Sequence, residues 1–166
     1  MRLTGHTAPW TVLGRNSRDA IFTASWADRD WRNVPGPFCA AETDTCGGGR
    51  SLAPDLILVN EDWTEFVFRQ PADSMQVVEL LDVAYDDPFE AYGCDGDDHW
   101  TLAEIRGWWA DRDRVARWIE SALRVMADQE ADGEIASLHD FLADIRGPLE
   151  GRLREYAYWI DNGEPD

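Results

Sequence analysis

Residues 55–70 read DLILVNEDWTEFVFRQ, and this stretch decides the class of fold. Two runs rich in β-branched and aromatic side chains, 55–60 and 64–70, lie on either side of a polar turn at 61–63. Such runs separated by a few polar residues are typical of an antiparallel hairpin. Residues 9–14 and 20–26 have the same character around a polar turn at 15–18, so they predict another hairpin.

The segment between the two predicted hairpins, residues 27–54, reads as a long loop. It contains the triplets Pro35-Gly36-Pro37 and Gly47-Gly48-Gly49, and neither suits the interior of a helix or a strand. Long loops in compact domains often carry function.

From residue 71 onwards the apolar residues recur at helical spacing. A first helix is predicted because five of them share one face: Val77, Leu80, Leu81, Ala84 and Tyr85. The triplet Asp-Asp-Pro at 86–88 ends this helix.

Thr101 and Glu104 have the spacing of a capping box, which predicts that a second helix begins there, with a break near 111–113. Apolar stripes within 138–145 and 149–160 predict the last helices, and Pro148 suits the first turn of the final one. The chain is therefore predicted to be a single α+β domain, residues 1–166. Its β-rich part, 1–70, would hold about four strands in antiparallel hairpins, packed with four or five helices in a helical part, 71–166.

Charge is the strongest indication of function. The chain has 33 Asp and Glu residues against 15 basic residues, all of them Arg, for a net charge of −18. Residues 51–105 hold fourteen of the acids and one Arg. A surface of this sign repels nucleic acid and anionic membranes and attracts basic proteins or cations. The alternative interpretation is that the acidity only maintains solubility.

No apolar run in the sequence is long enough to span a bilayer, and the first residues, MRLTGH, do not have the pattern of a secretory leader. The three Cys residues are an odd number, which favours reduced thiols over a disulfide framework. We therefore expect a cytoplasmic protein without membrane contacts.

Residues 93–104 are a candidate calcium loop. Read as a loop of twelve residues, this stretch places Asp95, Asp97 and Glu104 at ligand positions. It departs from the calcium-loop pattern at Gly93, where an acid is expected, and at Asp98, where the sharp turn requires Gly. An acidic turn before a capped helix is the simpler interpretation.

Zinc is the second metal candidate, with Cys39, Cys46, Cys94 and His99 as the ligands. The residue types fit, but structural zinc sites usually pair ligands about two to four residues apart, and Cys39 and Cys46 are separated by six. Ordinary thiols are the simpler interpretation, so the sequence requires no cofactor.

The sequence contains few signs of catalysis. It has no Gly-x-Ser-x-Gly elbow, phosphate loop or His-Glu-x-x-His motif, and chance supplies carboxylate pairs freely among 33 acids. An enzymatic role is therefore the less favoured one. A small metal-dependent enzyme or calcium-binding protein that uses residues 95–104 is the alternative function, and a housekeeping domain is the second alternative.

Several Trp residues lie in predicted turns beside polar residues: Trp31 beside Asp30, Trp63 beside Asp62 and Trp100 beside His99. An exposed aromatic with acidic neighbours suits an Arg or Lys side chain of a partner. The leading hypothesis is an acidic binding protein, of the inhibitor, immunity-protein or DNA-mimic type, that docks a basic, nucleic-acid-acting protein and does not itself bind nucleic acid. Six of its predicted contact residues are acids expected on one solvated face: Asp86, Asp87, Glu90, Asp95, Asp97 and Asp98. Trp63 and Trp100 are the predicted aromatic anchors.

Overall fold

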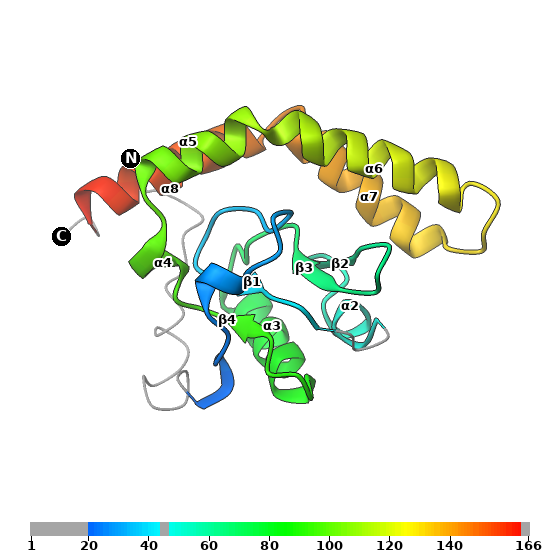
Figure 1. Cartoon of the computed structure of the whole chain (residues 1–166), viewed down its shortest axis with the longest axis horizontal. Helices are drawn as coiled ribbons and strands as arrows, with labels where there is room; N and C mark the ends of the chain where they lie inside the picture. The colour runs from blue at the N-terminus through cyan, green and yellow to red at the C-terminus, as the bar shows by residue number, and fades with distance from the viewer. Residues whose placement is uncertain (1–19, 44–46, 164–166) are drawn as a thin grey trace. The chain divides into compact units, whose positions relative to one another are not determined.

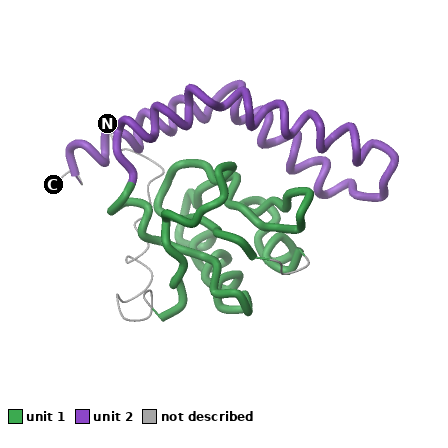
Figure 2. The backbone as a smooth tube through the Cα atoms, viewed as in Figure 1, with its two compact units in different colours: residues 1–99 green, residues 100–166 purple. Residues whose placement is uncertain are grey.

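The computed structural model describes residues 20–43 and 47–163, which belong to two compact units, residues 1–99 and residues 100–166 (Figure 2). The described residues contain seven α-helices and two antiparallel pairs of short strands (Figure 1). The predicted α+β class is therefore confirmed, and the single domain stays a prediction. Among the described residues, no helix combines the length and the apolar character that crossing a membrane requires.

The predicted hairpin at residues 55–70 is confirmed. Strands β2 (Ile57–Val59) and β3 (Glu65–Val67) pair antiparallel, and every residue of both strands is buried. Asn60 fixes the turn between them, because its side-chain oxygen accepts hydrogen bonds from the amides of Asp62 and Thr64 at 2.9 Å each.

A second pair of strands joins segments that are far apart in the chain, β1 (Cys39–Ala40) and β4 (Tyr92–Gly93). The strand predicted at 20–26 is wrong: residues 20 and 21 are helical, and the 3₁₀ turn η2 (Trp26–Asp28) follows. Phe22 is buried against Phe38, with their ring centroids 5.5 Å apart. Side-chain burial therefore fixes this segment in place of strand pairing. The strand predicted at 9–14 lies outside the described residues.

The stretch predicted to be a loop, 27–54, contains β1 and the short helix α2 (Gly48–Leu52). The prediction that the three glycines exclude a regular element is therefore wrong. Gly47 precedes the helix at a φ of 81°, a left-handed conformation that favours glycine. The carboxylate of Glu65 accepts hydrogen bonds from the amides of Gly49 and Arg50 at 2.9 and 3.3 Å, and a Cβ at Gly49 would clash with this carboxylate.

Helix α3 (Ser74–Asp86) belongs to the first unit, and it ends where the sequence predicted. Its buried face packs into the core and contacts α2. Val77, Leu80 and Ala84 are buried as predicted, whereas Tyr85 is 77% exposed, so its assignment to the core is wrong. The short helix α4 (Gly96–His99) completes this unit, whose core contains Phe22, Phe38, Ala40, Ala53, Leu56, Ile57, Val67, Val77, Leu80, Val83, Ala84, Tyr92 and Cys94.

The second unit consists of four helices, α5 (Leu102–Ala110), α6 (Arg112–Met126), α7 (Asp132–Ile145) and α8 (Leu149–Asn162). The predicted capping box at Thr101 and the break at Asp111 are both confirmed. Helix α6 packs along α7, and α5 packs along α8 (Figure 1). With α3, these make five helices of nine residues or more after residue 71, in agreement with the predicted four or five.

Candidate functional site

Acidic and basic side chains of the first unit differ in exposure. Residues 20–43 and 47–99 include sixteen acids and four Arg residues. Ten acids are exposed: Asp28, Glu42, Asp55, Glu61, Asp62, Asp73, Asp82, Asp86, Glu90 and Asp98. The four Arg residues are Arg29, Arg32, Arg50 and Arg69, and none of them is exposed. The described part of this unit therefore exposes many acids and no Arg residue, because Arg32 is buried and Arg29, Arg50 and Arg69 are half-buried.

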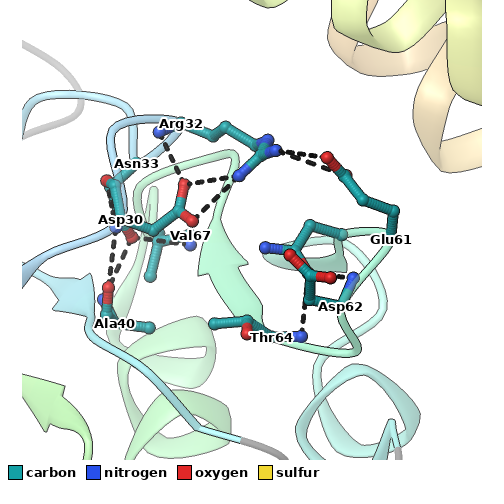
Figure 3. Close-up of polar contacts among 9 residues, drawn as sticks. Asp30, Arg32, Asn33, Ala40, Glu61, Asp62, Thr64 and Val67 are labelled. Atoms are coloured by element: carbon teal, nitrogen blue, oxygen red, sulfur yellow. Dashed lines mark hydrogen bonds and ion pairs between the residues drawn. The ribbon is translucent and has the colours of Figure 1, made fainter.

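Arg32 is the one of these four Arg residues that is buried. Its side chain is 7% exposed, and its guanidinium contacts Asp30 at 2.9 Å and Glu61 at 3.1 Å (Figure 3). The amide of Arg32 also donates to Asp30 Oδ1 at 2.8 Å. Arg29 lies flat against Trp26, 3.5 Å from the ring centroid. These cations are occupied by contacts within the unit.

A cavity of about 560 Å³ opens beside Arg32, and we call it the Trp31 cavity. Among the described residues that line it, four are acidic and Arg32 is the one basic residue. These lining residues are Asp28, Asp30, Trp31, Arg32, Glu42, Asn60, Asp62 and Thr64. Asp30 is engaged by Arg32, whereas no ion pair joins Asp28, Glu42 or Asp62 to a cation within the described residues.

The walls of the Trp31 cavity are fixed by Asn33 and Asn60. Asn33 is buried, and its side chain bonds the carbonyl oxygens of Asp30 and Ala40 and the amides of Ala40 and Val67 (Figure 3). These bonds tie the loop that carries Trp31 to β1 and β3. Because Asn60 holds the opposite turn, Asp62 and Thr64 are fixed as well. The cavity walls are therefore held by side-chain hydrogen bonds of the buried Asn33 and the half-buried Asn60.

The lining of this cavity indicates what it can bind. Carboxylates attract a cation, and an indole ring adds a cation–π surface. Arg32 already uses these features, since its guanidinium lies 4.4 Å from the Trp31 ring centroid and contacts Asp30. A second guanidinium or ammonium group would find similar partners at Asp28, Glu42 and Asp62.

The acids predicted as contact residues differ in their environments. Asp86, Glu90 and Asp98 are exposed, and Asp95 and Asp97 are half-buried. The expectation that Asp87 is solvated is wrong, because Asp87 is buried. Its carboxylate accepts hydrogen bonds from the Thr43 hydroxyl and from the amides of Phe89 and Ala91, so it holds the loop after α3 together.

The two predicted Trp anchors also differ. Trp63 is 61% exposed and has a φ of 63°, in the turn between β2 and β3. Trp100 is buried, so the expectation that it is an exposed anchor is wrong. A large aromatic side chain in a predicted turn can be exposed or buried, because the packing of the surrounding residues determines its exposure.

The described residues contain no group of three or more His, Cys, Asp or Glu residues that could hold a metal ion. Asp95 Oδ2 lies 3.0 Å from His99 Nε2, and Glu104 closes the capping box with Thr101. Cys39 and Cys94 are buried, and Cys46 lies outside the described residues. Burial, together with the charge of Asp95, raises the pKa of the Cys39 thiol to about 12.

The sequence analysis missed Asp28 and Glu42 as candidate binding residues. Two pairs in the sequence pointed to this region, Trp31 beside Asp30 and Trp63 beside Asp62, because Asp30, Trp31 and Asp62 line the cavity. It also missed the exposed apolar face of α3, although Met75 and Val78 lie opposite the predicted buried face. No protein-family model, curated protein or solved structure matches this chain. Charge and geometry are therefore the basis for a functional proposal.

Proposed function

We propose that the first unit is an acidic docking module that binds a basic protein, and that the chain inhibits a nucleic-acid-acting partner in the cytoplasm. The observation that supports this is the separation of charge by exposure. Ten acids of the unit face solvent, whereas its four described Arg residues are buried or half-buried. A partner that binds phosphates would find carboxylates in their place, as in immunity proteins and DNA mimics.

The Trp31 cavity gives this proposal a specific contact. A Lys or Arg side chain of the partner would enter the cavity, pair with Glu42 and Asp62 and lie against Trp31. Burying a charged anchor in a fixed pocket favours slow dissociation. The wider acidic surface would mainly increase the rate of association.

The test is competition for purified basic proteins encoded next to this gene, each bound to a labelled DNA duplex or RNA. We expect the wild-type chain to displace nucleic acid from one of them. Its association rate should fall at least about tenfold between low and high salt, because charges are screened over about 8 Å at 0.15 M ionic strength. Failure to displace nucleic acid from any of these proteins would contradict the proposal.

A matched pair of charge reversals locates the contact. Glu42→Arg with Asp62→Arg changes two exposed acids that line the cavity, and Asp128→Arg with Asp140→Arg makes the same charge change at exposed positions of the second unit. The first pair should abolish displacement of nucleic acid, because it places the new Arg side chains against basic residues of the partner. The second pair should retain most of the displacement. Equal effects would mean that only net charge matters and would exclude the cavity as the contact.

A further inference from the structure

The outer face of α3 carries apolar side chains that the core does not use. Met75 is 74% exposed, Val78 is 41% exposed and Tyr85 is 77% exposed. Val78 and Tyr85 lie three and ten residues after Met75, which places all three on one side of the helix, turned away from the buried residue Leu80. Exposed apolar residues that gather on one face mark interaction surfaces more often than scattered ones do.

This face is held in a fixed position at both ends of the helix. Asp73 accepts a hydrogen bond from the amide of Gln76 at 3.0 Å at the start of α3. After its end, the buried carboxylate of Asp87 bonds the amide of Phe89, whose ring is 57% exposed. Side-chain hydrogen bonds from Asp73 and from the buried Asp87 therefore hold this helix and the loop that presents Phe89.

Acidic residues accompany the apolar ones. Asp82 lies within the stripe at i+7 from Met75, and Glu79 and Asp86 lie along one side of it. No Arg or Lys occurs in the sequence between Arg69 and Arg106. A second copy of the chain would place these acids against acids, whereas a basic partner would pair with them. Charge therefore favours a basic occupant over self-association.

We propose that the outer face of α3 docks an amphipathic basic segment of the partner. Apolar side chains of that segment would cover Met75, Val78 and Tyr85, and flanking Lys or Arg residues would reach Glu79 and Asp82. Ten residues of helix span about 15 Å, so the segment needs about three helical turns or an equivalent extended length. This inference rests on the proposed function, because it names the kind of surface that the basic partner would present.

Three synthetic peptides of equal length test this proposal, in titrations followed by fluorescence anisotropy. The first is an amphipathic Lys–Leu helix, the second has Ser in place of every Leu, and the third has Glu in place of every Lys. We expect the Lys–Leu peptide to bind at least about tenfold more tightly than either of the others, because only it offers both charge and apolar area.

Variants then place the binding site on α3. Met75→Gln with Tyr85→Gln removes two exposed apolar side chains with a residue that favours helix, and Val125→Gln with Tyr158→Gln does the same at exposed positions of the second unit. The first double variant should weaken binding of the Lys–Leu peptide about tenfold and leave the Lys–Ser peptide unchanged. The control variant should bind both peptides like the wild type.

The possible failures differ in meaning. If the Lys–Ser peptide binds as tightly as the Lys–Leu peptide, the acidic docking module stands and the α3 face is excluded. If the Glu–Leu peptide binds as tightly as the Lys–Leu peptide, the occupant is not basic and the inference is wrong. The inference is also wrong if sedimentation shows a dimer of the wild type that Met75→Gln with Tyr85→Gln abolishes. Failure of the proposed function itself would appear in the competition with nucleic acid, which does not depend on these peptides.

Discussion

Replacing Tyr92 by Phe should lower the free energy of unfolding by about 2 to 3 kcal/mol, because it leaves a buried carboxylate without its shortest hydrogen bond. The Tyr92 hydroxyl donates to Glu65 Oε2 at 2.6 Å, and both residues are buried. Hydrogen bonds to charged groups contribute about 1.5 to 3 kcal/mol each. Since the substitution keeps the ring, it opens almost no cavity, and the loss reports on the hydrogen bond.

A double-mutant cycle with Glu65→Gln separates this bond from other effects. The Gln side chain keeps an oxygen for the amides of Gly49 and Arg50, and its NH₂ group can donate to the Tyr92 oxygen. Without the negative charge, the Tyr92→Phe change should cost only about 1 kcal/mol. The two substitutions should therefore be non-additive by about 1 to 2 kcal/mol.

The assay is urea unfolding of the full chain, followed by circular dichroism and Trp fluorescence together. Tyr85→Phe is the matched control, since its hydroxyl is on an exposed side chain of the same unit, and it should change stability by less than about 0.5 kcal/mol. A Tyr92→Phe variant whose midpoint and m-value equal those of the wild type would refute this account of Glu65.

Alkaline pH gives a second readout of the same contact. Burial and the neighbouring Glu65 carboxylate raise the pKa of Tyr92 well above its ordinary value of 10.0. Tyr92 therefore keeps its proton in the folded state at a pH where the unfolded chain loses it. Stability is fully present below about pH 10 and falls as pH rises above it, by up to about 1.4 kcal/mol per pH unit. The difference between wild type and Tyr92→Phe should shrink over this range.

Two further predictions concern other buried or capping groups. Burial raises the pKa of Cys39 from its ordinary value of 9.0 to about 12. The free energy of unfolding of the wild type should therefore fall by about 1.4 kcal/mol per pH unit from pH 9 upwards, and that of Cys39→Ala should fall less. Equal losses of stability in the two proteins between about pH 8 and about pH 11 would contradict this. Thr101→Ala should destabilise the second unit by about 1 kcal/mol, because Thr101 Oγ1 accepts a hydrogen bond from the Glu104 amide. Thr101→Ser keeps this hydroxyl and should retain most of the wild-type stability in a thermal melt.

The sequence predicted those elements whose local signals agree with their packing. The hairpin at β2 and β3, the end of α3 at Asp86 and the capping box at Thr101 all depend on neighbours within a few residues. The strand predicted at 20–26 failed for the opposite reason. Its composition suits a strand, but the burial of Phe22 against Phe38 and the hydrogen bond from the Ala24 amide to the Tyr92 carbonyl oxygen decide its conformation.

The candidate site was harder to predict, because its polar contacts join residues far apart in the chain. Glu65 stabilises the glycine-rich start of α2 from sixteen residues away, and Thr43 donates to Asp87 across 44 residues. Acidic residues look alike in a sequence, whether they are exposed like Asp86 or buried like Asp87. Only the folded chain distinguishes an acid that can meet a partner from one that holds a loop.

The two units treat their Arg residues differently, and this contrast bears on the alternative that acidity serves only solubility. In residues 100–163, seven of the eight Arg residues are exposed, and several form exposed ion pairs, such as Arg154 with Glu150 and Arg146 with Glu120. In the described part of the first unit, none of the four is exposed. Solubility requires only a charged surface of mixed sign, as the second unit has. In the described part of the first unit ten acids are exposed and no Arg residue is, which strengthens the negative field of that unit and supports a role in steering a basic partner towards it.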